Sequence, residues 1–284
     1  MTSRDFGAAR AVRGDNRQDF ADGEWWAPHR GVRLPREATA AVDLIDATLA
    51  IAPIGAVVSG PSSPVLWRSP VPERVLREPV EITLPPGGFH ISRPGVTCRR
   101  RHLHPDHVTR WEGRPVTSPV RVVIDLAAHL HAAELVAVAD DFIRRGLLSQ
   151  DFLRHWAHRL RRRHGIGLVR EIVDYVDPRA ESPRESMMRC ILWRAGYVDL
   201  QPNVEIRNAA GDFLARGDLV DAKRKIVVEY DGAHHLTRSG QASDAHRRLR
   251  LVTDGWLEVT VVGEDLFPET GLLRKVALAY DARR

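Results

Sequence analysis

The chain has 284 residues, more than the roughly 100–200 of a typical domain, so we expect two domains. Its 43% hydrophobic and 28% charged residues exclude a disordered or fibrous protein, and its two cysteines exclude a disulfide framework. The net charge of +5, from 42 Lys and Arg against 37 Asp and Glu, favours contact with phosphate groups only modestly, because GC-rich coding also enriches arginine.

The N-terminus shows no targeting segment. Its first twenty residues are polar and lack an apolar stretch of signal-peptide length, and no run in the chain approaches 18 apolar residues. We therefore expect a cytoplasmic protein without membrane contact, in which Cys98 and Cys190 stay reduced.

The first 118 residues predict mixed α and β structure. Two short apolar segments around Pro28, from Gly23 to Leu34, indicate a β-hairpin, and apolar residues at helical spacing over 38–52 predict a helix. Further strands are expected at 80–84, 95–101, 108–111 and 113–116.

From residue 119 the pattern is helical. Apolar stripes predict helices over 120–127, 135–143, 152–162 and 168–176, and the densest group of arginines lies within 154–163. The segment Asp177-Pro178-Arg179-Ala180 is the expected linker, which gives parts at 1–40, 41–176 and 180–284.

The last hundred residues predict a helix, three strands, a helix, a strand and a helix. Ser182, Pro183 and Glu185 form the capping signature of the first helix, which Gly196 ends. The strands are expected at 203–207, 214–220 and 226–230, followed by a helix capped by Ser243, a strand over 256–262 and a helix over 270–280.

Two carboxylates interrupt these strands. Asp218 and Glu229 lie at similar distances from the turn near Lys223, so their side chains can converge. Two like charges at one point favour a bound cation, and Mg²⁺ (or Mn²⁺) with one or two carboxylates, a backbone carbonyl, for which Tyr230 is the candidate, and several waters fits such a site. The chemistry would be hydrolysis of a nucleic-acid backbone by a metal-activated water.

Other candidates surround this pair. His234 and His235 follow the third strand closely enough to supply a general base, and Glu185 begins the preceding helix. Arg247, Arg248 and Arg250 on the next helix are candidates for binding DNA phosphates.

The motifs Arg216-Gly-Asp-Leu-Val-Asp221 and Val227-Val-Glu-Tyr-Asp-Gly-Ala-His-His235, with Glu181-Ser-Pro-Arg-Glu-Ser186 before them, carry a resemblance. Residues 181–267 resemble the domain family related to very-short-patch repair endonucleases, of the PD-(D/E)XK superfamily. The resemblance implies a restriction-endonuclease-like α-β-β-β-α-β-α core in which Asp218 and Glu229 bind metal, Glu185 lies nearby and a histidine assists. The usual lysine is replaced by Asp231, so either His234 and His235 take its role or activity is lost.

Residues of about 20 to 150 resemble, more loosely, the antitoxin-like proteins of abortive-infection systems, with Gly23 to Val32 similar to the wing of a winged helix. The three expected parts are thus a partial winged-helix segment (1–40), an antitoxin-like mixed α/β then helical region (41–176) and a nuclease domain (180–284). The fold class is α/β, of the α+β type.

Two functions follow as hypotheses. The first is a metal-dependent DNA endonuclease or nickase, and the second is a catalytically inactive regulator of antitoxin type that binds DNA or a protein partner such as a toxin; an RNA substrate and any oligomeric state stay open. Simpler roles stand beside the candidates: Glu185 as a helix cap, Asp218 as a turn former, Glu229 as the partner of an arginine such as Arg216, the histidines as loop residues, and the arginines as solvated helix faces.

Overall fold

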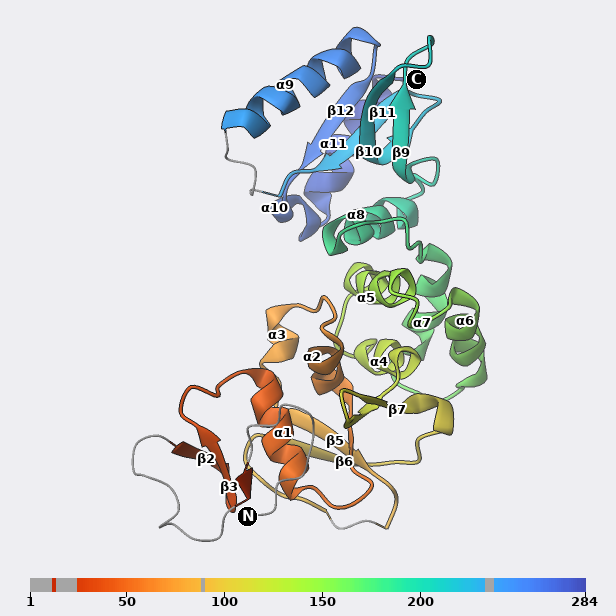
Figure 1. Ribbon diagram of the computed structural model, residues 1–284. Coiled ribbons are helices and arrows are strands. Elements are labelled where there is room, and N and C mark those ends of the chain that lie inside the picture. Colours follow the sequence, from red (N-terminus) through yellow and green to blue (C-terminus); the bar gives the residue numbers. More distant parts are fainter. Residues whose placement is uncertain (1–11, 14–24, 88–89, 233–237) are drawn as a thin grey trace. The chain divides into compact units, whose positions relative to one another are not determined.

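The computed structural model describes residues 12–13, 25–87, 90–232 and 238–284, and within these the protein is α+β (Figure 1). The chain folds into two compact units. Unit 1 comprises the chain up to residue 130 together with 147–170, and unit 2 comprises 131–146 and 171–284. None of the described helices is long and apolar enough to cross a membrane.

Unit 1 begins with the expected hairpin. Strands β2 (Trp25–His29) and β3 (Val32–Pro35) pair antiparallel, and β1 (Val12–Arg13) adds to β3. Helix α1 (Ala41–Ile51) packs on this hairpin because its small residues contact the buried side chains of β3. The hairpin expected as a wing is therefore present and is held against a helix.

A five-stranded mixed sheet forms the centre of unit 1, in the order β6-β5-β4-β8-β7. Its strands are β4 (Val57–Val58), β5 (Val80–Leu84), β6 (Val96–Arg100), β7 (Val108–Trp111) and β8 (Arg114–Thr117). Strands β5 and β6 pair parallel, as do β4 and β8, so the sheet is not a simple meander. The sequence predicted four of these strands and missed β4, which has only two residues.

Helices complete unit 1. They are α2 (Ser63–Trp67), α3 (Glu73–Leu76), α4 (Pro119–Leu126), α6 (Gln150–Arg159) and α7 (Ile166–Ile172), which crosses the boundary at residue 170. Short 3-10 turns lie at Gly60–Ser62, Pro105–His107 and Val173–Tyr175. The apolar stripe of α4 is wholly buried, which confirms the helical periodicity found in the sequence.

Two helices from distant parts of the sequence open unit 2. Helix α5 (Ala132–Arg144) packs on α8 (Pro183–Arg194), and the fully buried side chains of Asp140 and Arg189 form an ion pair between them. The linker expected at 177–180 lies within this unit, as does α5.

The sheet of unit 2 has the order β12-β11-β10-β9. Strands β9 (Gln201–Arg207), β10 (Phe213–Asp221) and β11 (Ile226–Tyr230) are antiparallel neighbours, and β12 (Leu257–Val261) runs parallel to β11. Helices α9 (Arg238–Thr253), α10 (Gly263–Leu266) and α11 (Thr270–Asp281) complete the unit (Figure 1). The order expected for the last hundred residues is thus observed, with the short α10 added.

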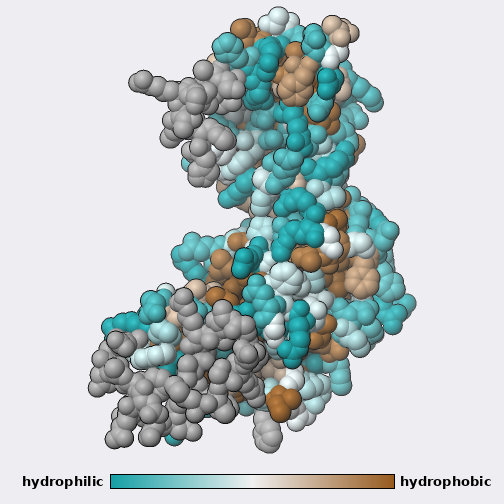
Figure 2. All heavy atoms as spheres, viewed as in Figure 1, coloured by the Kyte–Doolittle hydropathy of each residue, from teal (hydrophilic) through white to brown (hydrophobic). Residues whose placement is uncertain are grey.

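Two details of unit 2 differ from the expectation. Helix α9 begins at Arg238, five residues before the cap expected at Ser243. The apolar spacing of 188–195 also predicts that Ala195 faces the core, but Ala195 is exposed, directly after the end of α8 at Arg194. On the face shown in Figure 2, hydrophilic side chains cover most of unit 2.

Candidate functional site

Asp218 and Glu229 lie opposite each other on β10 and β11. The paired residues Leu219 and Val228 adjoin them, so continuing the antiparallel register places Asp218 across from Glu229. Val220 and Val227, two positions away, belong to a buried cluster with Leu251 of α9. Because alternate strand residues share a face, both carboxylates lie on the face that α9 covers.

Each of the two carboxylates has a partner. Asp218 Oδ2 accepts a hydrogen bond of 2.8 Å from the backbone N–H of Tyr230, and Glu229 Oε1 accepts one of 2.8 Å from Arg247 Nη1. Arg216, named as a possible partner of Glu229, instead pairs with Glu181 at 2.6 Å. An arginine does neutralise Glu229, but it comes from α9.

Burial raises the pKa of both carboxylates, and negative charge nearby adds to the increase at each of them. Burial raises the pKa of Asp218 to about 6, with the charge of Glu185 adding to the increase. Burial also raises the pKa of Glu229 to about 7, and the charge of Asp218 contributes further, against the opposing effect of Arg247. The pair is therefore costly to ionise fully near neutral pH.

Glu185 is used as a helix cap. Its backbone N–H donates to Ser182 Oγ at 3.2 Å, and its Oε2 accepts hydrogen bonds from the backbone N–H of Glu181 at 2.8 Å and from Asn203 Nδ2 at 3.0 Å. Ser182 caps the helix as expected, whereas the Glu185 carboxylate accepts from the backbone of Glu181 rather than from that of Ser182. The charge of Glu185 still raises the pKa of Asp218, so the two carboxylates lie near each other.

The other candidate residues differ in their exposure to solvent. Tyr230 is half-buried, and Asp231 is exposed, its backbone N–H donating to the carbonyl of Val261 at 2.7 Å. Arg250 is exposed on α9. His234 and His235 lie outside the described residues.

Glu258 on β12 was not singled out from the sequence. Its Oε1 accepts from Arg248 Nε at 3.0 Å and lies 3.4 Å from Arg247 Nη2, while its Oε2 is buried without a hydrogen-bond partner in the described structure. An acidic residue inside the apolar strand Leu257–Val261 was the signal that could have found it. Two of the three candidate DNA-binding arginines, Arg247 and Arg248, thus already pair with carboxylates.

The described carboxylates leave a divalent cation few free oxygens. In the part of the chain that the structure describes, no group of three or more His, Cys, Asp or Glu side chains could hold a metal ion. One oxygen of Asp218 and one of Glu229 are already engaged, by Tyr230 and Arg247. Mg²⁺ binding at this position therefore stays a prediction.

Comparison with known proteins places a family resemblance in the first two thirds of the chain. Residues 65–171, from within α2 into α7, match the AbiEi antitoxin C-terminal domain. The expected likeness of this region to antitoxins is confirmed, whereas no match supports a PD-(D/E)XK or short-patch repair domain.

The chain is also similar to two proteins of Mycobacterium tuberculosis, the uncharacterized protein MT2308 and the uncharacterized protein Rv2248 of a second strain. Each is 26% identical over 204 residues, which cover 69% of this chain and 75% of the relative. No solved structure matches the chain.

Proposed function

We propose that this protein is a regulator of antitoxin type, which acts by binding DNA or a protein partner rather than by cutting nucleic acid. The observation that carries this proposal is the match of residues 65–171 to the AbiEi antitoxin C-terminal domain. The state of the carboxylates agrees with it, because Glu229 is paired with Arg247 and Glu185 caps a helix. Salt-bridged acids suit a structural role better than a catalytic one.

The first test is toxin neutralisation. The protein encoded beside this chain in its genome is expressed alone and together with the chain, and growth of the host is measured. An antitoxin restores growth that the neighbouring protein inhibits. Growth inhibition that persists at equal expression of the full chain, together with no binding between the two purified proteins, would contradict a role in toxin control.

DNA binding is tested separately with a duplex from the region upstream of the protein's own gene and a shuffled duplex of equal length. We expect preferential retardation of the upstream duplex. Arg250→Ala should weaken binding and reduce the salt slope by about 1 if this arginine contacts a phosphate. Arg274→Ala, which removes an exposed arginine from α11, is the matched control and should leave binding unchanged.

A metal-dependent DNA endonuclease is the second candidate, because Asp218 and Glu229 lie opposite each other on neighbouring strands. There the charge of Asp218 raises the pKa of Glu229. Supercoiled plasmid is incubated with Mg²⁺ or Mn²⁺ and the intact chain, Asp218→Ala, Glu229→Ala or the exposed control Glu264→Ala. Nicking by the intact chain and the control, but by neither site variant, supports the nuclease. No nicking by the intact chain removes this candidate and leaves the regulator.

A further inference from the structure

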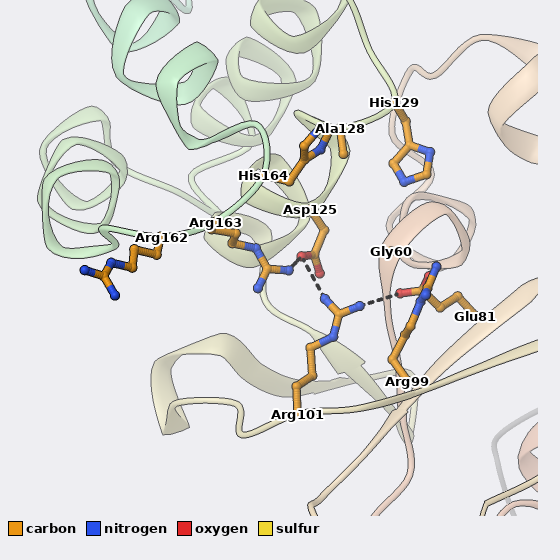
Figure 3. A pocket seen from close by; sticks show the side chains of 10 residues that line it. All are labelled: Gly60, Glu81, Arg99, Arg101, Asp125, Ala128, His129, Arg162, Arg163 and His164. Atoms are coloured by element: carbon orange, nitrogen blue, oxygen red, sulfur yellow. Dashed lines mark hydrogen bonds and ion pairs between the residues drawn. The ribbon is translucent and has the colours of Figure 1, made fainter.

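A cavity of about 360 Å³ lies in unit 1, whereas the carboxylate pair belongs to unit 2 (Figure 3). Its basic lining comes from three places in the sequence: the end of β6, the segment after α4 and the loop between α6 and α7. These places supply Arg99, Arg101, His129, Arg162, Arg163 and His164. Their convergence is a tertiary feature, and the segment 154–163 is only one part of it.

Two buried acids orient the arginines. Arg99 Nε donates to Glu81 Oε2 at 3.3 Å, and Arg163 hydrogen-bonds Asp125 Oδ1. Arg101 lies between the two acids, with its Nη2 at 3.6 Å from Glu81 and its Nη1 at 3.7 Å from Asp125. Both distances exceed hydrogen-bond length, so these are ion pairs that hold the charge of Arg101 between the two acids.

Hydrogen bonds from other buried side chains hold the two acids in place. Ser59 Oγ donates to Glu81 Oε1 at 3.2 Å, and Thr83 Oγ1 donates to Ser59 Oγ at 2.8 Å. Arg121, which is 2% exposed, donates from Nε to Asp125 Oδ1 at 2.9 Å. This buried network gives the guanidinium groups defined positions before any ligand arrives.

Glycine at two positions allows close packing around the cavity. A Cβ on Gly60, whose φ is +55°, would lie 2.5 Å from Glu81 Oε1. A Cβ on Gly165 would lie 2.7 Å from the carbonyl carbon of Ala127, so glycine lets the loop that carries Arg162 and Arg163 rest against the end of α4. Side chains at either position would displace the acid or the loop.

The charge of the cavity determines what can bind. The lining holds four arginines, Arg99, Arg101, Arg162 and Arg163, and two carboxylates, so positive charge exceeds negative charge among these groups. Guanidinium groups match phosphate oxygens in pairs, and a cavity of this volume lies in the range of small-molecule sites, roughly 300–1,000 Å³. A small organic molecule that carries a dianionic phosphate group meets both conditions, of charge and of size.

We propose that this cavity binds a small phosphate monoester of mononucleotide size, with Arg99, Arg101 and Arg163 contacting the phosphate and His129 and His164 contacting the rest of the ligand. Glu81 and Asp125 are positioning residues. The proposal does not depend on the regulator function, because a ligand site in unit 1 is compatible with either candidate.

The test is calorimetric titration of the full chain with the four 5′-ribonucleoside monophosphates, the corresponding nucleosides and inorganic phosphate. At least one monophosphate should bind about tenfold or more tighter than both its nucleoside and inorganic phosphate. Arg101→Met and Arg99→Met should each weaken that binding by about tenfold. The Arg99 side chain is 55% exposed, so its variant tests the site without disturbing the fold.

Arg110→Met is the matched control, because Arg110 is an exposed arginine of β7 outside the cavity and should leave binding unchanged. Equal binding of nucleosides and monophosphates, or tighter binding of inorganic phosphate, would overturn the proposal. The absence of monophosphate binding would also overturn it. This includes the case in which Arg101→Met and Arg99→Met weaken only the binding of duplex DNA, which would make the cavity part of a nucleic-acid surface.

Discussion

Packing requires glycine at position 217, directly before Asp218 on β10. A Cβ there would lie 2.6 Å from Cγ2 of both Val220 and Val227. Two valine side chains therefore fill the space that a side chain at position 217 would need.

Gly217→Ala should therefore destabilise unit 2 by about 1–3 kcal/mol, because the valines must move to admit the methyl group. Urea unfolding measures the effect. Gly167→Ala is the control, since its Cβ would meet no atom within 4 Å and alanine favours the helix α7. An equal loss of stability in both variants would contradict the packing explanation.

Glu229 gives the second residue-scale prediction, a pH dependence. Its pKa is raised from 4.5 to about 7, so the folded state holds the proton more tightly than the unfolded state. The resulting stability is present below pH 4.5 and is lost as pH rises through about 7, by at most about 3 kcal/mol. Asp218, with a pKa raised to about 6, acts in the same direction.

Glu229→Gln should lose less stability than the intact protein between pH 5 and pH 8, because the glutamine cannot ionise while it can still accept from Arg247. Urea unfolding at several pH values in this window measures the difference. Glu264→Gln, at an exposed glutamate of α10, should follow the intact protein. A parallel pH dependence of the Glu229 variant would show that its ionisation does not limit stability.

At the scale of elements, α1 is tied to β8 by a buried ion pair. Arg114 donates from Nε and Nη2 to the two oxygens of Asp46 at 2.7 and 2.8 Å, and the side chains are 5% and 3% exposed. Such a two-point contact fixes the orientation of the helix on the strand as well as its distance.

Asp46→Ala should destabilise unit 1 by about 3–5 kcal/mol, because it leaves the guanidinium of Arg114 buried without its main partner. The double variant Asp46→Leu/Arg114→Met should recover most of this loss, as thermal or urea unfolding will show. Glu112→Gln is the control: this second partner of Arg114 is 52% exposed, so its loss should cost no more than about 1 kcal/mol. Additive losses in the double variant would show that the pair itself contributes little.

At the scale of the whole molecule, the division of the chain into two units determines where it can be truncated. Unit 2 includes α5, and Arg189 of α8 binds both Asp140 of α5 and the carbonyl of Tyr175. A fragment of residues 180–284, cut at the linker expected from the sequence, lacks both partners and exposes the face of α8 that α5 covers.

We expect the fragment 180–284 to be less soluble and to melt at a lower temperature than the fragment 131–284, which keeps α5, Tyr175 and the connection between them. Circular dichroism and soluble yield under identical expression provide the measurement. Equal melting temperatures would show that residues 180–284 fold without α5 and that the boundary predicted near residue 180 is the better one.

Local sequence determined much of this protein. Alternation predicted the strand at 80–84 and an apolar run predicted the one at 226–230, with the bounds that β5 and β11 show. The capping signature at Ser182 predicted the start of α8. The same signals are short-range, because side-chain period and caps depend on residues only a few positions apart. They could not find β4, which is too short to show a period.

Tertiary structure alone decided which groups meet. The sequence placed Asp218 near Glu229 through one tight turn, but the neutralisation of Glu229 by Arg247 depends on where α9 packs. The pairing of Asp46 with Arg114, of Asp140 with Arg189, and the cavity between Glu81, Asp125 and the loop arginines join positions far apart in the chain. The burial of polar groups requires such partners, and only the folded chain determines which partner lies within reach.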